Sequence, residues 1–306
     1  MSHPLVSIII NCYNSDQYLI KAIQSIFNQS YKEWEIIFWD NASTDNSADI
    51  AKSFGKKLKY FKSQKNTNLG KARKEAILKA SGDYIAFLDC DDEWLKNKLS
   101  TQVQALEENK NYSFCYGGVH YINQNNKPIL DYLPKARSGY VLPLQLSKYE
   151  IGIQSVLIRK GTDLDFNPDL EFSPDYDLLM NIASKYKAYV INDYLINYRI
   201  VSESLTSKKI DIWWIEMKYT LDHIIQTNPS LLLKYPKEFK KAYAKVNYLK
   251  AKLFFSNNQN LKAIKTLSEY KFVSTKYFGL FIISIFGKNF WNFVQNKINI
   301  LERAQK

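Results

Sequence analysis

The first third of the chain alternates continuous apolar runs with segments of helical spacing, and this alternation restricts the possible folds more than any other feature. Leu5–Asn11, Glu35–Asp40, Lys59–Ser63 and Asp83–Asp89 have the composition of short strands. Strands that are near-continuous in apolar residues are typical of a parallel sheet buried on both faces. The sequence therefore predicts an α/β fold in which a mostly parallel sheet is flanked by helices.

The remaining pattern divides the chain near Ser202–Lys209. We expect one α/β domain over residues 1–206 and an α-helical region over residues 207–306, where the spacing is helical throughout. The helices expected in the first domain are one that begins at Ser15 or Asp16, Asp45–Phe54, Gly70–Ala80, Leu95–Glu107 and one that follows Pro174. The further strands are Tyr112–Ile122, Ile153–Arg159 and Ala188–Val201. The C-terminal helices are Ile210–Thr227, Pro236–Ser256, Asn260–Tyr270 and Tyr277–Leu301.

Charge is distributed unequally between these two regions. Residues 1–206 carry 24 Lys and Arg against 24 Asp and Glu, whereas residues 207–306 carry 18 against 6 and so supply the whole net charge of +12. A basic region joined to a neutral body predicts an anionic partner, either a membrane surface or a nucleic acid. The three cysteines have no metal-ligand spacing and fit reduced thiols in the cytoplasm.

Four carboxylates follow the apolar run Tyr84–Leu88 within five positions: Asp89, Asp91, Asp92 and Glu93. The carboxyl ends of strands in open α/β sheets are where ligands bind. Carboxylates this close repel one another unless a cation lies among them, and an all-oxygen set favours Mg²⁺ or Mn²⁺. A lone Asp-x-Asp motif is more often a solvated acidic turn, so its meaning depends on the neighbouring strand ends.

Polar residues also follow the other predicted strands. Asn11–Asn14 follows the first strand and Asp40–Asp45 the second, and Asn66–Arg73 contains Gly70 at the start of a helix. Asparagine and aspartate after strands are common turn formers and helix caps, but here they recur at successive ends of one sheet. The pattern predicts a nucleotide site in which a helix N-terminus and basic side chains approach a diphosphate.

These motifs resemble those of the family 2 glycosyltransferases, which have the GT-A fold. The matching strings, in family order, are V-S-I-I-I-N-C-Y-N, I-F-W-D-N-A-S-T-D-N-S, N-L-G-K-A-R, G-D-Y-I-A-F-L-D-C-D-D-E-W, S-P-D-Y-D-L and Y-R-I-V-S-E-S-L-T. The resemblance runs from about Pro4 to Ser207. It implies that residues 1–206 form a GT-A nucleotide-sugar-binding catalytic domain, of the kind that builds bacterial cell-envelope glycans.

The resemblance also implies roles in binding a nucleotide-sugar donor. Asp40 and Asn41 are expected to contact the uracil and the ribose, and Asn11 and Tyr13 are expected to form the wall of the base pocket. Arg73 matches the basic residue that the family places near the nucleotide.

The acidic motif is expected to meet the ribose and the metal. Asp89 is the expected ribose contact, and Asp91, supported by Asp92, is the expected ligand of a Mg²⁺ or Mn²⁺ ion that neutralises the diphosphate leaving group. Related sequences often carry a metal-binding histidine in the string Y-R-I-H-x-x-S, but this chain has Val201 there. The ion would then be held by Asp91, phosphates and water, or by another side chain in place of the histidine.

Transfer by single displacement also requires a base for the acceptor hydroxyl. Asp175 stands where the family places this acid, at the start of a helix after a proline. An acid at this position can also serve only the helix dipole, so the catalytic role rests on the resemblance. Asp177, two residues further along and on a different side of the helix, is the second candidate.

The C-terminal region contains the most apolar run of the chain, Tyr277–Phe286, which at ten residues is about half the length of a membrane-spanning helix. Continued as one helix, it would carry a polar stripe of Ser284, Lys288, Asn292 and Gln295. Such a helix either packs in a core or lies among the headgroups of an anionic membrane. The lysines over the same region favour the membrane, and nucleic acid is the weaker candidate because no binding motif is present.

The sequence thus predicts a metal-dependent, inverting glycosyltransferase, a hexosyl- or N-acetylhexosaminyltransferase. It would move a sugar from a nucleotide diphosphate, with UDP favoured, to a hydroxyl of a lipid-linked or cell-envelope glycan. The expected location is the cytoplasm, at the inner face of the cytoplasmic membrane. The alternative is a non-catalytic nucleotide-sugar-binding or scaffold protein of the same fold, and the intact Asp-x-Asp motif and Asp175 argue against it. A nucleotidyltransferase would need a glycine-rich phosphate loop, which Asn11–Asn14 does not provide.

Overall fold

The computed structural model describes residues 3–201 and 210–294. The chain divides into two compact units, the first formed by Met1–Leu142 and Glu150–Val201, and the second by Pro143–Tyr149 and Ser202–Lys306. The second unit therefore takes in a short piece of the α/β part of the sequence, which includes most of helix α5 (Leu142–Ser147). The boundary expected at residue 206 lies outside the described residues.

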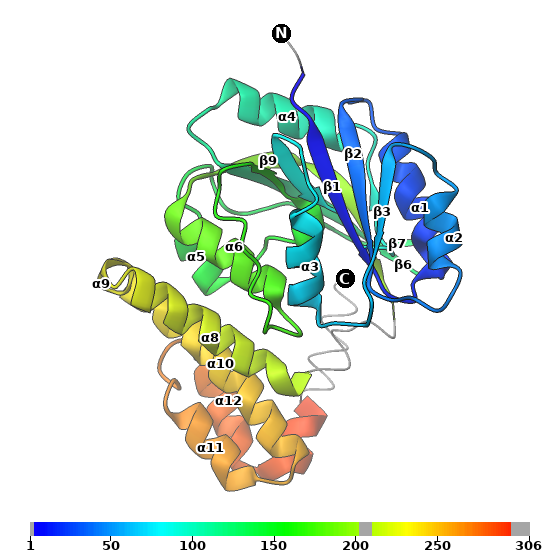
Figure 1. The fold of residues 1–306 in the computed structure, drawn as a ribbon. Helices are drawn as coiled ribbons and strands as arrows, with labels where there is room; N and C mark the ends of the chain where they lie inside the picture. Colours follow the sequence, from blue (N-terminus) through cyan, green and yellow to red (C-terminus); the bar gives the residue numbers. More distant parts are fainter. Residues whose placement is uncertain (1–2, 202–209, 295–306) are drawn as a thin grey trace. The chain divides into compact units, whose positions relative to one another are not determined.

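The first unit is built on one sheet, whose nine described strands have the spatial order β3-β2-β1-β4-β8-β6-β9-β5, with β7 paired to β6. The neighbours among β1 to β4 are parallel, as the apolar runs predict, and β1, β2 and β3 lie side by side in Figure 1. In the second half β6 and β9 are parallel, but β8, β7 and β5 are antiparallel to their neighbours. The sheet is therefore mixed. Its strands are β1 (Val6–Cys12), β2 (Trp34–Asp40), β3 (Leu58–Lys62), β4 (Tyr84–Phe87), β5 (Glu93–Trp94), β6 (Phe114–Asn123), β7 (Pro128–Tyr132), β8 (Leu157–Arg159) and β9 (Ala188–Ile200).

Helices cover both faces of this sheet, which explains why the central strands are apolar along their whole length. In β1 and β2 every residue except Asn11 and Trp39 is buried. Apolar side chains of β1, α1 and α4 form one core cluster, and α3 packs against β1 and β2. The helices are α1 (Asp16–Phe27), α2 (Ser47–Lys52), α3 (Leu69–Ile77), α4 (Lys98–Glu108) and α6 (Pro174–Lys185), with a short 3₁₀ helix at Ile153–Ser155.

Helix α4 begins later than expected because the residues before it continue the sheet. Glu93 and Trp94 form β5, which pairs with Asn197 and Ile196 of β9, and the Leu95 amide donates to the Leu195 carbonyl at 2.9 Å. The acidic turn after β4 is therefore held at both ends by strands, with β1 on one side and β9 on the other.

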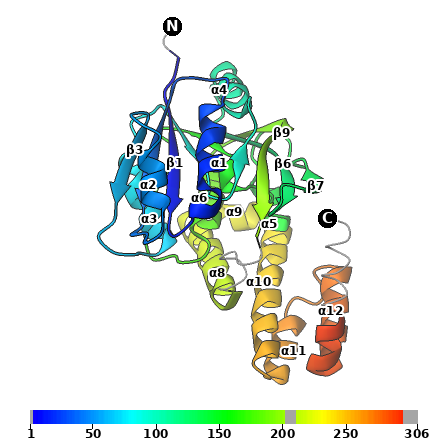
Figure 2. The same cartoon turned by 90° about the vertical axis from the view of Figure 1, so that its right-hand side faces the viewer.

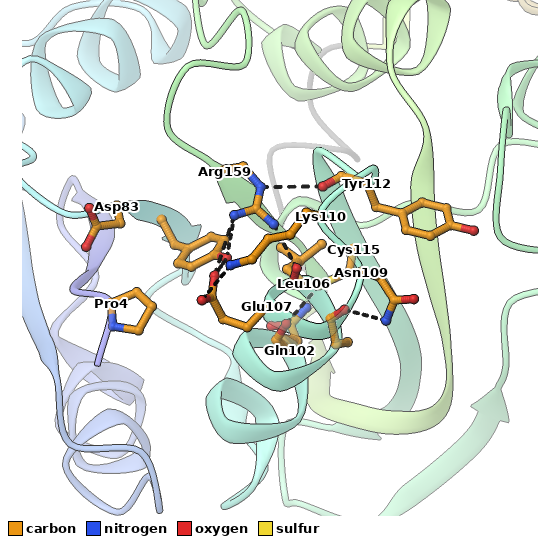
Figure 3. Close-up of polar contacts among 12 residues, drawn as sticks. Pro4, Asp83, Gln102, Leu106, Glu107, Asn109, Lys110, Tyr112, Cys115 and Arg159 are labelled. Atoms are coloured by element: carbon orange, nitrogen blue, oxygen red, sulfur yellow. Dashed lines mark hydrogen bonds and ion pairs between the residues drawn. The ribbon is translucent and has the colours of Figure 1, made fainter. Parts of the chain in front are cut away.

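A polar network ties β4, β8 and α4 together at the edge of the sheet where β4 begins (Figure 3). Arg159 donates to the Tyr84 hydroxyl and to the Leu106 carbonyl, both at 2.8 Å. Glu107 accepts from the Tyr84 hydroxyl at 2.5 Å and from Lys110 at 2.7 Å. An open cleft of about 600 Å³ adjoins the network. Its cations and carboxylates are paired with one another, so we read this network as structural support and not as a ligand site.

The second unit is helical. In it α10 packs against α8 and α11, and α11 packs against α12, as the views of Figures 1 and 2 agree. The core cluster of this unit consists of Ala251, Phe255, Ala263, Leu267, Leu280 and Trp291. No helix in the described ranges is both long and apolar enough to cross a membrane. The helices are α8 (Ile210–Thr227), α9 (Ser230–Lys234), α10 (Pro236–Ser256), α11 (Asn260–Ser268) and α12 (Thr275–Ile285).

The prediction of a single helix over Tyr277–Leu301 is wrong. Helix α12 ends at Ile285, and helical residues resume only at Gly287, whose φ of +82° is a left-handed backbone conformation that glycine adopts without steric cost. The expected polar stripe is broken with it. Ser284 is buried and donates to the Phe281 carbonyl, Lys288 donates to the Ser256 carbonyl and to Asn258, and Gln295 lies outside the described residues.

Candidate active site

Hydrogen bonds between side chains and backbone amides connect the loops that follow β1 and β2. The Asn14 amide donates to the Ser43 hydroxyl at 3.1 Å, and the Thr44 amide donates to the Asn14 side chain at 2.8 Å. Asn14 and Ala42 have φ values of +48° and +66°, so both loops turn sharply as soon as their strands end. This linkage makes one rigid wall from the two predicted nucleotide-binding segments.

Asp40 is fully buried at the end of β2, and both oxygens of its carboxylate accept hydrogen bonds from other residues of the protein. The Ser43 amide donates to one oxygen at 2.7 Å, and the Tyr60 hydroxyl donates to the other at 2.5 Å. Burial, followed by the hydrogen bond to Asp40, raises the pKa of Tyr60 and keeps the phenol a donor. Asp40 therefore shapes the loop, and a contact with a base would require one of these bonds to give way.

Asn41 is likewise engaged by the protein. Its amide nitrogen donates to the Asn66 side chain and to the Thr67 carbonyl, both at 2.8 Å, and its oxygen accepts from the Thr67 amide. The polar groups left open in this region belong to other expected site residues. The Asn11 amide nitrogen is buried with no hydrogen-bond partner among the described residues, and the Tyr13 ring is 47% exposed.

Gly70 serves a different purpose from the one expected of it. Its amide donates to the Leu170 carbonyl at 3.2 Å, so the start of α3 is used by the protein and is not open to a phosphate. A Cβ on Gly70 would lie 2.2 Å from the Asn167 carbonyl oxygen. The missing side chain is what allows the segment before α6 to pack directly on α3.

Three expected site residues from distant parts of the sequence meet at one guanidinium. Arg73 of α3 is 4% exposed, and its Nη2 lies 3.0 Å from Asp89 at the end of β4. Its Nη1 forms an ion pair with Asp175 in the first turn of α6. The side chains of Asp89 and Asp175 remain 38% and 27% exposed, although Oδ1 of Asp175 is buried against Arg73. Burial lowers the pKa of Arg73 although Asp89 opposes that shift.

The second acid on α6 lies elsewhere. Asp177 is only 4% exposed, and its backbone carbonyl accepts from the Asn181 side chain. Of the two candidate bases, Asp175 is the one that is linked to Asp89 through Arg73.

Within the acidic turn, Asp91 and Asp92 occupy different surroundings. Burial, and then the charge of Asp89, raises the pKa of Asp91 to about 6. Asp92 is 1% exposed, and burial raises the pKa of its carboxyl well above the usual range. One Asp92 oxygen accepts from the Arg199 amide at 2.8 Å, and the other is buried with no hydrogen-bond partner among the described residues. Acids with such raised pKa values favour either a proton or a nearby cation.

A divalent ion would depend on the substrate for part of its coordination. In residues 3–201 and 210–294, no three His, Cys, Asp or Glu side chains are grouped so as to hold a metal. The side chain of Val201, where the family often has histidine, offers no ligand atom. The oxygen-only chemistry of Asp91 and the unpartnered Asp92 oxygen nevertheless fit Mg²⁺ or Mn²⁺, which commonly share one or two carboxylates with substrate phosphates. We therefore find the residues compatible with a metal shared between the protein and a diphosphate.

Comparison with known proteins identifies the family. The model of the family described as Glycosyl transferase family 2 matches residues 7–160, which is half of the chain. The chain is a family 2 glycosyltransferase. It is 31% identical over 212 residues to the Escherichia coli enzyme named UDP-Glc:alpha-D-GlcNAc-diphosphoundecaprenol beta-1,3-glucosyltransferase WfgD, a match that covers 68% of this chain and 82% of WfgD. It is 30% identical over 230 residues to an uncharacterised glycosyltransferase of Methanocaldococcus jannaschii, covering 72% of this chain and 79% of that protein.

Solved structures of low sequence identity share the fold of this glycosyltransferase. The structure of S. aureus TarS 1-349 in complex with UDP-GlcNAc superposes with a TM-score of 0.66 at 16% identity, covering 96% of this chain and 91% of that one. The mannosyltransferase PcManGT from Pyrobaculum calidifontis, in complex with GDP-Man and Mn²⁺, superposes with a TM-score of 0.61 at 15% identity, covering 99% and 87%. The GT-A fold expected from the sequence is thereby confirmed.

Some polar residues around the site of this glycosyltransferase were given no role by the sequence. Tyr60 and Ser43 donate hydrogen bonds to Asp40, and the buried Arg199 donates one to the Asp91 carbonyl of the acidic turn. Arg199 belongs to a matched family string, so its position could have drawn attention. Tyr60 lies in a short strand without any recognisable motif, and only the three-dimensional structure reveals its partner.

Proposed function

We propose that this family 2 glycosyltransferase is an inverting, metal-dependent hexosyl- or N-acetylhexosaminyltransferase that takes its sugar from a UDP-sugar. The acceptor would be a hydroxyl of a lipid-linked, cell-envelope glycan. The observation that carries the proposal is the meeting of Asp89 and Asp175 at Arg73, beside Asp91. This contact supports the proposal because it links Asp175, a partly exposed carboxylate that could remove a proton, to the acids proposed to meet a nucleotide diphosphate.

The relatives support the substrate classes. The name of WfgD specifies UDP-glucose as donor and a diphosphoundecaprenol-linked sugar as acceptor. The TarS structure contains UDP-GlcNAc, whereas that of PcManGT contains GDP-Man and Mn²⁺. We favour UDP because the stronger sequence similarity is to an enzyme named for a UDP-sugar.

The proposed reaction is a single displacement. The acceptor oxygen attacks the anomeric carbon of the sugar on the face opposite the diphosphate, and the bond from that carbon to the diphosphate oxygen breaks. Asp175 takes the proton of the acceptor hydroxyl, and the nucleoside diphosphate leaves with the bond's electrons. A divalent cation bound by Asp91 and the diphosphate would supply charge neutralisation of the leaving group. Asp89 would contact the ribose, with the Asn11 amide and the Tyr13 ring lining the base pocket.

Arg73 acts on both sides of this chemistry. Because its guanidinium is buried between Asp89 and Asp175, it offsets their mutual repulsion and fixes the direction in which each carboxylate points. The diphosphate of the donor would be attracted to the Arg73 cation. We therefore expect the donor to bind before Asp175 takes the proton of the acceptor hydroxyl.

We further propose that the second unit associates with the anionic inner face of the cytoplasmic membrane. Large apolar side chains that remain exposed gather in its last described helices, and such groups mark interaction sites. Lys271 lies over the rings of Phe272 and Phe281, at 5.1 and 4.8 Å from their centroids, so a cationic group adjoins the exposed aromatic residues. This combination is typical of helices that lie in the headgroup region. The exposed residues are Phe272, Phe278, Ile282, Ile285, Phe286, Phe290 and Phe293.

A donor screen tests the proposed activity against the scaffold alternative. Wild-type protein with Mn²⁺ is incubated with a panel of UDP- and GDP-sugars, and the nucleoside diphosphate released without acceptor is measured. We expect slow release from one UDP-sugar and none from that sugar with Asp91→Asn. Binding of a UDP-sugar without release, even when lipid-linked acceptors are added, would favour the non-catalytic scaffold.

A further inference from the structure

The acidic turn is bound from the interior of the protein by one arginine. Arg199, near the end of β9, is 2% exposed, and its Nε donates to the Asp91 carbonyl at 2.9 Å. Its Nη2 lies 2.5 Å from the Glu93 carboxylate. The backbone amide of the same residue donates to Asp92 at 2.8 Å. Asp91 and Asp92 of the turn, and Glu93 at the start of β5, are therefore attached to a single position of β9.

The far side of Arg199 is also fully engaged. Its Nη1 donates to the Asn123 carbonyl at 3.3 Å and to the Asn126 side chain, in the turn between β6 and β7. The guanidinium lies over the Tyr18 ring of α1, 4.5 Å from its centroid. The arginine thus connects the acidic turn to two other elements, and each nitrogen of its planar group has a partner.

The two acids of the turn differ in the direction they face. Asp91 is only partly buried, whereas Asp92 is enclosed and uses one oxygen to hold the Arg199 backbone. A residue that holds the frame of a site does not need to touch the ligand. The second oxygen of Asp92 has no hydrogen-bond partner among the described residues. A metal ligand would use this oxygen to bind the ion, whereas a positioning residue would not.

We propose that Arg199 and Asp92 are positioning residues, which fix the acidic turn so that Asp91 faces the diphosphate and its metal. The inference rests on the proposed function for the presence of that metal. Partners that orient a ligating carboxylate typically change metal affinity by 10–100-fold when they are removed. Lysine cannot replace Arg199, because a single ammonium on a flexible stem cannot reach Asp91, Glu93 and Asn126 together.

Mn²⁺ uptake, measured by electron paramagnetic resonance in the presence of saturating UDP, tests this directly and needs no turnover. Asp92→Asn keeps an oxygen that can accept from the Arg199 amide but removes the negative charge that Asp92 would need as a metal ligand. Asp92→Ala removes both. We expect Asp92→Asn to bind Mn²⁺ within about threefold of wild type, and Asp92→Ala and Arg199→Lys to bind at least about tenfold more weakly.

Arg159→Lys is the matched control. Arg159 is another arginine of the same sheet that donates to backbone carbonyls and to a hydroxyl, but it lies at the edge where β4 begins. Thermal melting of all variants separates lost stability from lost positioning. Arg159→Lys is expected to lower the melting temperature and leave Mn²⁺ uptake unchanged.

Each other outcome overturns a defined part of the inference. If Asp92→Asn binds Mn²⁺ as poorly as Asp91→Asn, Asp92 is a metal ligand and not a positioning residue. If folded Arg199→Lys binds as wild type does, the turn does not depend on the arginine; if that variant does not fold, the two Asp92 variants decide. Wild-type protein that takes up no Mn²⁺ with UDP would refute the proposed metal site itself, and this inference with it.

Discussion

Arg73 joins Asp175, the proposed base, to Asp89, the first acid of the Asp-x-Asp motif, within one buried cluster. The two acids come from opposite halves of the first unit, and a guanidinium is charged at every accessible pH. Their shared cation makes the donor site and the proposed base a single electrostatic unit. Removing the charge of either acid should therefore change the electrostatic environment of the other, because both are paired with Arg73.

Replacing the proposed base should separate catalysis from binding. Asp175→Asn keeps the shape of the side chain but cannot accept a proton, so we expect turnover to fall at least about a hundredfold, the usual contribution of a positioned base. UDP-sugar affinity, measured by calorimetry, should change much less. Asp165→Asn is the control, because Asp165 precedes α6 on the same segment and is 75% exposed in its ion pair with Lys74. An active Asp175→Asn beside an inactive Asp177→Asn would assign the base to Asp177.

A methyl group at Gly70 should disturb the proposed base from a distance. The Cβ of Gly70→Ala would overlap the Asn167 carbonyl, and this backbone leads into the helix that carries Asp175. Overpacking of this kind costs about 1–3 kcal/mol of unfolding free energy, so we expect a lower melting temperature together with reduced turnover. Gly279→Ala is the matched control. Gly279 has open space around it inside α12, and alanine there should stabilise the helix by up to about 1 kcal/mol. A Gly70→Ala variant of unchanged stability would show that the loop can move away.

The strands that position the site could be predicted because their residues are apolar along their whole length. The runs that became β1, β2, β3 and β4 were expected within a few residues of their observed bounds. β5 and β7 were not expected. β5 has only two residues, and β7 is half exposed, so neither produces a buried pattern in the sequence. Their pairing with β9 and β6 depends on contacts between distant segments.

The chemistry of the site was harder to predict than its location. Sequence motifs predicted that Arg73, Asp89 and Asp91 gather at one edge of the sheet, because strand order fixes where the carboxyl ends lie, and in the structure Arg73 lies 3.0 Å from Asp89. They could not show that Asp40 is already occupied by Tyr60, because hydrogen bonds between separate strands leave no spacing signal. Gly70 illustrates the same limit, since a glycine needed for close packing and one needed for a phosphate are alike in sequence.

The raised pKa of Asp91 makes metal uptake depend on pH. In the metal-free fold the carboxyl has a pKa of about 6, so a proton competes with the cation below that value. We expect the apparent affinity for Mn²⁺, measured with UDP, to fall about tenfold for each pH unit below 6, because one proton must leave for each ion bound.

The same shift has a consequence for stability. Because the folded pKa lies above the ordinary value of 3.8, the folded protein binds this proton more tightly than the unfolded chain does. The ionised group therefore destabilises the metal-free protein at neutral pH, and the effect decreases steadily as pH falls from 6 and is gone only below 3.8, where the unfolded chain is protonated too. Metal-free Asp91→Asn should melt at a higher temperature than wild type at pH 7.5, and the difference should become smaller below pH 6 and vanish only below the unfolded pKa of 3.8. A constant difference across this range would show that Asp91 ionises normally.

The membrane proposal requires point substitutions and not truncation, because the core of the second unit includes Leu280 and Trp291 from its last helices. Removing everything after Tyr270 would expose that core and unfold the unit, whatever the surface does. Phe286 and Phe290 are 68% and 43% exposed, so replacing both with serine removes apolar surface without opening a cavity.

Phe286→Ser with Phe290→Ser should weaken binding to vesicles that contain anionic lipid by at least about tenfold, since each aromatic side chain contributes burial energy in the headgroup region. Leu261→Ser is the control: Leu261 is 84% exposed on α11 of the same unit, and its loss should have little effect. Binding of wild type should also decrease as salt rises, because only the lysine contribution is screened. Transfer to a membrane-embedded acceptor should fall with vesicle binding, while donor hydrolysis stays unchanged. If wild-type protein ignores anionic vesicles at low salt, the exposed aromatic residues meet a different partner and the membrane proposal is wrong.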